Sequence, residues 1–206
     1  MTYKTEQELF WASEEWGKNY IERNSYKKVK NNINFFSNII SKTSGIKSII
    51  EFGSNIGLNL IALKNIMPNA DFSAIDINKN ACQELEKLGF IKTIYNKSIL
   101  DFEINTQKEL VLIKGVLIHI KPEYLDVIYK KLYDASSRYI LIAEYYNPDP
   151  IEVNYRGESG KLFKRDFAGE MLDKFDDLEL VDYGFQYHRD NNFPLSDVTW
   201  FLLRKI

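Results

Sequence analysis

Two glycines four positions apart, Gly53 and Gly57, separate an apolar segment from a second segment with helical periodicity. The stretch IIEFGSNIGLNLIAL, residues 49–63, is typical of a buried strand that turns directly into a helix, and such turns hold nucleotide-like ligands. No glycine lies two positions after Gly53 and no Gly-Lys-Ser/Thr follows, so the fingerprints of dinucleotide-binding folds and of phosphate-binding loops are absent. Glu51, at the end of the strand, would repel phosphates. The turn therefore indicates a ligand that approaches without a diphosphate.

Asp76 ends the next apolar segment, 19 residues after Gly57. An acid at this place accepts hydrogen bonds from both hydroxyls of a ribose, which favours a nucleoside. A neutral or cationic nucleoside, acidic surroundings and no phosphate cradle fit S-adenosylmethionine, which is the cofactor that we expect.

The segments around these residues alternate between strand and helix patterns. Strands are expected at residues 48–52, 71–77, 90–95, 109–114, 138–146, 178–185 and 197–206, and helices at 5–23, 29–43, 57–67, 78–88, 121–135 and 166–175. Strands that alternate with helices form a parallel sheet covered on both faces. The last two strands have no helix between them, so they must be antiparallel neighbours. The expected fold class is α/β, a Rossmann-like seven-stranded mostly parallel sheet with a C-terminal antiparallel hairpin and N-terminal helices.

Length and composition suit one domain, with 206 residues of which 45% are hydrophobic and 27% charged. A net charge of −2 gives no reason to expect nucleic acid or anionic lipid as a partner. No apolar run has the length of a signal peptide core or a membrane span, so the cytoplasm is the expected compartment. Cys82 is the only cysteine and the two histidines lie far apart, so we expect no disulfide and no metal site. The predicted organisation is a single domain, residues 1–206, with a helical lid at 1–45 and a catalytic core at 46–206, as a monomer or homodimer.

The stretch EFGSNIG, the acid of AIDIN and the terminal hairpin resemble class I S-adenosylmethionine-dependent methyltransferases. More narrowly, the chain is similar to the pseudaminic acid biosynthesis-associated methylases, a family found beside bacterial nonulosonic sugar pathways. The segments that carry this similarity are LFWASEEWGKNYIERN, KGVLIHI, AEYYNP, KLFKRDFAGEMLDKF and VDYGFQYHRD. The resemblance covers nearly the whole chain. It implies methylation of a nonulosonic sugar of the pseudaminic or legionaminic type, or of its nucleotide-activated form, in surface glycan biosynthesis.

The resemblance also implies which residues bind the cofactor. They are Tyr20, Arg23, Glu51, Gly53, Ser54, Asn55, Gly57, Asp76, Ile77, Ser98, Ile99, Lys114 and Gly115. In this pattern Asp76 binds the ribose, Ser98 and Ile99 contact the adenine, and Lys114 and Gly115 border the point of methyl transfer. Many relatives carry Asp where this chain has Ser98, so the adenine contact differs here.

Three side chains are candidates for a general base: His119, Glu144 and His188. A sugar hydroxyl would need such a base within hydrogen-bond reach, whereas an amine would need less help, and the sequence leaves O- and N-methylation open. His119 could equally hydrogen-bond the backbone and hold its loop.

Residues 145–165, rich in Pro, Gly, Asn and charge, are expected to form a long ordered loop that binds the acceptor. The candidate acceptor-binding residues are Tyr145, Tyr146, Tyr155, Arg156, Lys161 and Arg165. The tyrosines would stack on sugar faces, and the cations would pair with a carboxylate or phosphate. The alternative is that Arg165 pairs with Asp166 or Glu170 and that Arg156 is merely exposed.

Two other functions stay open. A nicotinamide-dependent sugar oxidoreductase is disfavoured by the glycine that is missing after Gly53. A methyltransferase-fold binding or scaffold subunit without catalysis is disfavoured by the intact segment 114–119 and by the polar segment 145–165.

Overall fold

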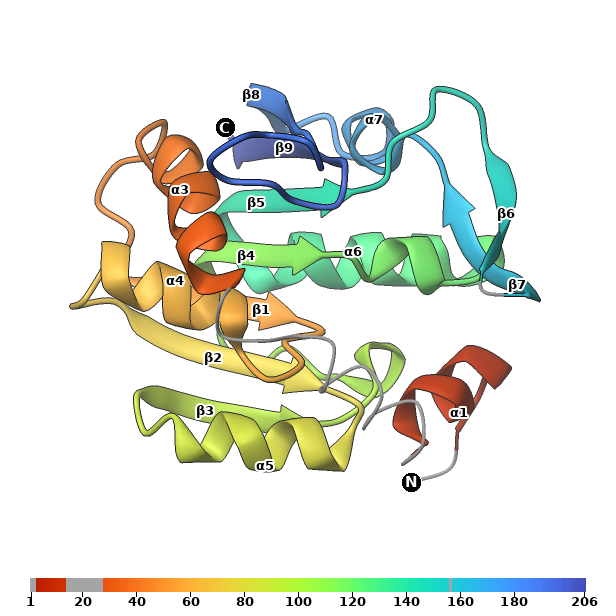
Figure 1. Ribbon diagram of the computed structural model, residues 1–206, viewed down its shortest axis with the longest axis horizontal. Helices are drawn as coiled ribbons and strands as arrows, with labels where there is room; N and C mark the ends of the chain where they lie inside the picture. The colour runs from red at the N-terminus through yellow and green to blue at the C-terminus, as the bar shows by residue number, and fades with distance from the viewer. Residues whose placement is uncertain (1–2, 14–27, 156) are drawn as a thin grey trace. The chain divides into compact units, whose positions relative to one another are not determined.

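The computed structural model describes residues 3–13, 28–155 and 157–206 (Figure 1). The chain divides into two compact units, Met1–Glu103 and Ile104–Ile206, which we call unit 1 and unit 2. The main sheet has seven strands, of which three belong to unit 1 and four to unit 2. The prediction of one domain with a lid and a core stays a prediction.

Unit 1 contains three parallel strands joined by helices. Its elements are α1 Glu6–Ala12, α3 Val29–Ile40, β1 Ser48–Phe52, α4 Leu58–Ile66, β2 Asp71–Asp76, α5 Lys79–Lys87, β3 Ile91–Asn96 and the 3₁₀ turn η2 Ile99–Asp101. Strand β2 lies between β1 and β3, in registers that pair Phe52 with Ile75 and Asp76 with Asn96. The carboxyl ends of the three strands therefore meet at one edge, where sheets of this kind bind their ligands.

Local sequence explains where the helices of unit 1 begin. Helix α1 begins with a capping box, in which Thr5 and Glu8 each bind the other's backbone N–H. Helix α5 begins after Asn78, whose side chain accepts hydrogen bonds from the N–H groups of Asn80 and Ala81. Helix α3 packs on α4 with an apolar face that includes the fully buried Phe36.

Unit 2 combines a parallel pair of strands with the antiparallel tail. Its elements are β4 Lys108–Lys114, the 3₁₀ turns η3 Leu117–His119 and η4 Pro122–Tyr124, α6 Leu125–Ala135, β5 Ser136–Glu144, β6 Ile151–Tyr155, β7 Glu158–Lys164, α7 Phe167–Lys174, β8 Leu178–Gln186 and β9 Val198–Lys205. The strand order in this unit is β4-β5-β9-β8. Strand β5 runs parallel to β4, whereas β9 runs antiparallel to both of its neighbours, β5 and β8. The fold class predicted from the sequence is confirmed.

The prediction of a loop over residues 145–165 is wrong, because part of this segment forms a β-hairpin. Strands β6 and β7 pair antiparallel in a separate two-stranded sheet, with Val153 opposite Leu162 (Figure 1). Most side chains of β6 are exposed, so the segment lacks the alternation of apolar and polar residues that identifies a half-buried strand. Glycine and charge, which suggested a loop, instead suit a turn and an exposed edge.

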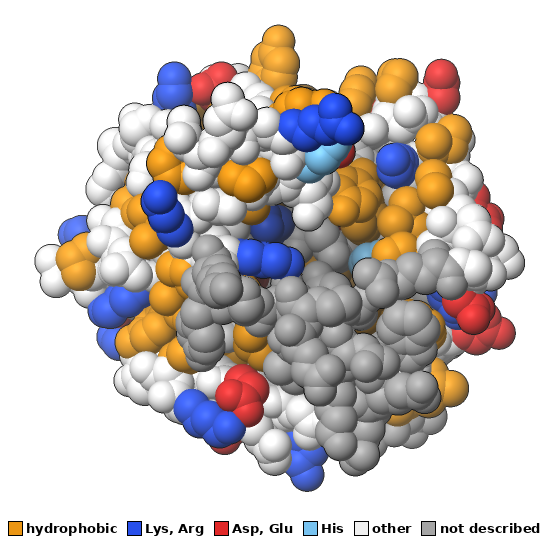
Figure 2. Space-filling model, in the orientation of Figure 1, with side chains coloured by type: hydrophobic (Ala, Val, Ile, Leu, Met, Phe, Trp, Pro, Cys, Tyr) orange, Lys and Arg blue, Asp and Glu red, His pale blue; other side chains and the backbone are white. Residues whose placement is uncertain are grey.

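The described surface in the view of Figure 2 is mixed in character. Lys and Arg side chains are scattered singly or in small groups and do not form one continuous basic patch (Figure 2). Among the residues that the structure describes, no helix is long and apolar enough to cross a membrane.

Candidate functional site

The turn after β1 is held against the end of β2 by its backbone. The N–H groups of Gly53 and Ser54 both donate to the carbonyl oxygen of Ile75, at 2.8 and 3.0 Å. Gly53 and Gly57 have φ values of 77° and 79°, in the left-handed region that favours glycine. A Cβ atom on Gly57 would also lie 2.8 Å from side-chain carbons of Leu85 and Leu88. The second glycine therefore allows α5 to pack closely on the turn.

Asp76 is fixed at the end of β2 by one backbone donor on each carboxylate oxygen. Oδ2 accepts from the N–H of Asn55 at 2.7 Å, and Oδ1 accepts from the N–H of Asn78 at 2.8 Å. Burial raises the pKa of Asp76 to about 6, although these two hydrogen bonds act in the opposite direction. Because each carboxylate oxygen has about two acceptor positions, Asp76 can accept two further hydrogen bonds from a ligand.

Glu51 is fully buried at the end of β1 and belongs to a chain of polar side chains. Its Oε1 accepts from Nδ2 of Asn59 at 2.6 Å, and Oδ1 of Asn59 accepts from Nδ2 of Asn32 at 3.0 Å. This chain connects the strand end to α4 and α3. Asn59 is the one polar residue in the first turns of α4, before Lys64 and Asn65, but its partners could not be predicted from spacing.

The segment after β3 begins against the backbone of Asp76 and Ile77. Nδ2 of Asn96 donates to the carbonyl oxygens of both residues, each at 3.1 Å. Ser98 then caps η2 by accepting a hydrogen bond from the N–H of Leu100. The structure thus brings together the turn after β1, Asp76, Ile77 and Ser98, and Ile99 follows as the first residue of η2. That these residues bind a nucleoside stays a prediction.

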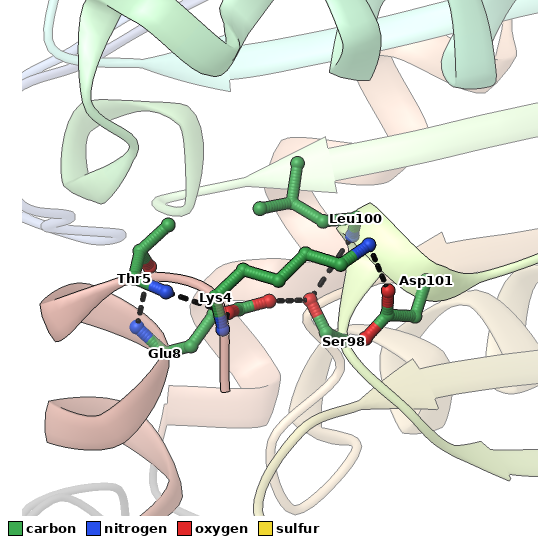
Figure 3. A network of polar contacts seen from close by, with 6 residues as sticks. All are labelled: Lys4, Thr5, Glu8, Ser98, Leu100 and Asp101. Atoms are coloured by element: carbon green, nitrogen blue, oxygen red, sulfur yellow. Dashed lines mark hydrogen bonds and ion pairs between the residues drawn. The ribbon is translucent and has the colours of Figure 1, made fainter. Parts of the chain in front are cut away.

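Helix α1 is attached to this same edge of unit 1 (Figure 3). The hydroxyl of Ser98 donates to Oε1 of Glu8, and Lys4 forms an ion pair with Asp101. Asn78 also donates from Nδ2 to the carbonyl oxygen of Trp11 at 3.0 Å. Sequence reasoning did not predict these contacts of Glu8 and Asn78.

Two of the predicted cofactor contacts cannot be placed. Tyr20 and Arg23, which were expected on the N-terminal helix, lie outside the described residues.

In unit 2, Glu144 is a buried carboxylate at the end of β5. Its Oε1 accepts from the N–H groups of Val116 and Leu117, both at 2.9 Å. Its Oε2 is also buried and meets no hydrogen-bond donor among the described residues. Burial raises the pKa of Glu144 to about 7, while the hydrogen bonds to the backbone partly oppose the shift. A carboxyl group with this pKa changes its protonation state near neutral pH.

Gly115 lies directly after β4 with a φ of 67°, and its N–H donates to the carbonyl oxygen of Ala143 at 3.0 Å. This hydrogen bond aligns the end of β4 with the end of β5. The neighbouring Lys114 contributes a positive charge that lowers the pKa of Glu144, as a minor effect.

His119 is buried and holds the β6–β7 hairpin. Its Nδ1 lies 2.7 Å from the carbonyl oxygen of Lys161, and because a carbonyl only accepts, Nδ1 carries the proton. Its ring packs edge-on against Tyr155 with centroids 5.1 Å apart. Burial lowers the pKa of His119 to about 4, so the ring is neutral at pH 7. Of the two roles left open by the sequence, these contacts favour holding the loop.

His188 is half-exposed in the connection between β8 and β9. Its Nδ1 lies 2.8 Å from a carboxylate oxygen of Asp197, and its N–H donates to the same side chain. The pair links two residues of one connection and gives no sign of a buried reaction centre.

The predicted acceptor residues differ in their surroundings. Tyr145 is half-buried with Lys164 Nζ 5.5 Å from its ring centroid, whereas Tyr146 is exposed. Nε of Arg165 lies 2.5 Å from Oε1 of Glu170, which is the ion pair given above as the alternative. Arg156 lies outside the described residues. The described residues also contain no group of three or more His, Cys, Asp or Glu side chains that could hold a metal ion.

Several solved structures that resemble this chain are methyltransferases. The plantazolicin methyltransferase BpumL, in complex with SAH, matches with a TM-score of 0.68 and 15% identity over 97% of this chain and 93% of its own. The magnesium protoporphyrin IX methyltransferase of Synechocystis PCC 6803, with bound SAM, matches with a TM-score of 0.68 and 11% identity over the whole of both chains. The chain has the fold of these methyltransferases. A SAM-dependent methyltransferase from Leishmania major gives the same TM-score over 85% of this chain and 72% of its own. No family model and no curated protein matches the sequence.

Proposed function

We propose that this protein is an S-adenosylmethionine-dependent methyltransferase. The observation that carries the proposal is the glycine turn tied to the end of β2 beside Asp76, on a fold shared with methyltransferases that hold SAM or SAH. The turn, residues 51–57, has one acidic and no basic side chain, which suits a sulfonium nucleoside better than a phosphate.

The residues of unit 1 fit the parts of this cofactor. The open acceptor positions of Asp76 match the two ribose hydroxyls, and the backbone of Gly53, Ser54 and Asn55 lies beside them. When bound, the cofactor supplies a methyl group activated by the positive charge on sulfur. The protein then has to hold and orient the acceptor, a contribution that can reach several kcal/mol.

For the acceptor we propose a nonulosonic sugar or its nucleotide-activated form, in the cytoplasm. This rests on the resemblance stated above and on the residues Tyr145, Tyr146, Tyr155 and Lys161 of unit 2. Aromatic rings stack on sugar faces, and a lysine can pair with a sugar carboxylate or phosphate. Arg165 is a weaker candidate for binding the acceptor, because its guanidinium already forms an ion pair with Glu170.

Among the three candidate bases, Glu144 suits the reaction of a hydroxyl best. Its Oε2 has acceptor positions that no described residue fills, and its pKa of about 7 lies near a working pH. Bound S-adenosylmethionine would supply the methyl group and keep the electron pair of the broken carbon–sulfur bond on sulfur. Oε2 of Glu144 would take up the proton that the acceptor hydroxyl loses. His119, neutral down to about pH 4 and bound to β7, is the weaker base.

The decisive experiment incubates the protein with methyl-labelled S-adenosylmethionine and a panel of nonulosonic acids and their nucleotide-activated forms. Mass spectrometry then locates the transferred methyl group on oxygen or nitrogen. Cofactor binding without transfer to any acceptor would support the scaffold alternative. Binding of NADH in place of S-adenosylmethionine would support the oxidoreductase.

A further inference from the structure

The strand order of unit 1 determines where the base of a bound nucleoside lies. If the turn after β1 takes the methionyl end and Asp76 takes the ribose, the base extends to the other neighbour of β2, which is β3. The hydrogen bonds of Asn96 hold the segment after β3 directly against Asp76 and Ile77. The residues that face the base are therefore expected in the segment 97–101.

Ser98 lies in this segment, but its hydroxyl already donates its proton in a hydrogen bond within the protein. The hydroxyl accepts from the N–H of Leu100 and donates to Oε1 of Glu8, which lies 90 positions earlier in the chain (Figure 3). The carboxylate of Asp101 forms an ion pair with Lys4. Glu8 is thus the carboxylate that α1 brings to the end of β3.

Glu8 is buried, and its two carboxylate oxygens accept different numbers of hydrogen bonds. Oε2 accepts from the N–H groups of Lys4 at 2.5 Å and of Thr5 at 3.0 Å, as part of the capping box. Oε1 accepts from Ser98, which leaves one of its two acceptor positions for a further donor. The capping box fixes the rotamer of Glu8, so this position is preorganised for a ligand.

Adenine presents an exocyclic amino group that donates hydrogen bonds, whereas hypoxanthine presents a carbonyl oxygen in the same place. A carboxylate accepts from the first and repels the second. We propose that Oε1 of Glu8 accepts a hydrogen bond from the amino group of the cofactor's adenine, so that α1 selects the base. The inference rests on the proposed cofactor, and it assigns base selection to a residue outside the strand ends.

The test compares two ligands that differ at this group, S-adenosylhomocysteine and its deaminated analogue S-inosylhomocysteine. Isothermal titration calorimetry measures the affinity of each ligand for the full chain and for the variants Glu8→Ala, Glu8→Gln and Glu6→Gln. Glu6 is an exposed residue of the first turn of α1 and serves as the matched control. Circular dichroism and thermal unfolding establish that each variant is folded.

The full chain should prefer the adenosyl ligand on the order of 10- to 100-fold, as expected for a hydrogen bond to a charged group. Glu8→Ala should reduce this preference to about threefold or less, and Glu6→Gln should retain it. Glu8→Gln keeps the shape of the side chain and adds an N–H donor, so the inosyl ligand should gain affinity relative to the adenosyl ligand. If Glu8→Ala does not fold, the ligand preference of Glu8→Gln tests whether Glu8 contacts the base.

Equal binding of both ligands by the full chain would overturn the inference while leaving the cofactor in place. If a folded Glu8 variant kept the full preference for the adenosyl ligand, the inference about Glu8 would also be overturned. If the folded full chain bound neither ligand, the proposed function would fail, and this inference with it.

Discussion

Asp76 and Glu144 are both carboxylates at the carboxyl end of a strand, and burial raises both pKa values, to about 6 and about 7. They differ in how backbone donors are distributed. Asp76 has one donor on each oxygen, which holds both oxygens in place for two hydroxyls. Glu144 has two backbone donors on Oε1 and none among the described residues on Oε2, so Oε2 is the oxygen that a reacting group can use. The first arrangement suits binding and the second suits proton transfer.

Replacing Asp76 by Ala should weaken binding of S-adenosylhomocysteine by on the order of 1.5–3 kcal/mol, because two charge-assisted hydrogen bonds to the ribose are lost. Calorimetry measures the change. Asp71→Asn, at the other end of β2 and in an exposed ion pair with Lys92, is the matched control and should bind normally. Normal affinity in a folded Asp76→Ala protein would mean that the ribose lies elsewhere.

Replacing Glu144 by Gln should lower kcat on the order of 100-fold or more if the acceptor is a hydroxyl, because the amide cannot take up its proton. In the unchanged protein kcat should rise with pH through about 7, as Glu144 loses its proton. The variant should lose this rise while KM for the acceptor changes little. A raised KM with an unchanged pH profile would instead give Glu144 a positioning role.

Stability gives a second measurement on Glu144 that does not depend on an acceptor. Because its pKa in the folded protein lies above the ordinary value of 4.5, folding favours the neutral carboxyl. This contribution is present below about pH 4.5 and is lost as pH rises through about 7. Urea unfolding between pH 5 and 8 should therefore show a smaller loss of stability in Glu144→Gln than in the unchanged protein. Parallel pH dependences would place Glu144 in a more polar environment.

At the scale of elements, the sequence predicted the helices and strands with strong periodicity. It missed the features that depend on contacts between distant segments. Strands β1 and β2 are buried on both faces, so their apolar runs identify them directly. Most side chains of β6 are exposed, and nothing in its pattern required a strand. Thr5 and Glu8 indicate the start of α1, but the bond from Glu8 to Ser98 spans 90 positions and leaves no local signal. Polar contacts between distant segments therefore had to come from the structure.

Helix α1 should become more protected when the cofactor site is filled. A ligand that contacts Glu8 binds only the state in which α1 lies on the end of β3, so that state gains population. Hydrogen exchange of the amides of α1 should slow by up to about 100-fold with S-adenosylhomocysteine at 100 times its Kd. Helix α6, which carries no predicted cofactor residue, is the internal reference. Unchanged exchange in α1 would show that the helix is not part of the site.

At the scale of the molecule, the alternation of strands and helices and the antiparallel tail were enough to predict the sheet. The prediction held because the strands β1, β4 and β5 are largely apolar and buried, and because helix starts such as Asn78 carry a clear cap. The proposed nucleoside part of the site rests on Gly53 and Asp76, whose places at strand ends are set by the fold. The proposed acceptor side could not be predicted in the same way, since it involves a hairpin and the burial of Glu144.

The whole chain should be stabilised by S-adenosylmethionine or S-adenosylhomocysteine and not by NADH. A ligand that binds only the folded state at 100 times its Kd adds about 2.7 kcal/mol to the free energy of unfolding. A thermal-shift measurement compares the ligands at equal concentration. Stabilisation by NADH alone would contradict the proposed cofactor.

The position of β9 has a consequence for the order of events during synthesis. Strand β9 lies between β5 and β8, yet the ribosome makes it after every other strand of the sheet. Until Val198–Lys205 has left the ribosome, β5 and β8 lack this shared neighbour and expose edges that can pair with other chains. Unit 1 has all of its strands long before that moment. Nascent chains stalled before β9 should therefore be the ones that chaperones hold.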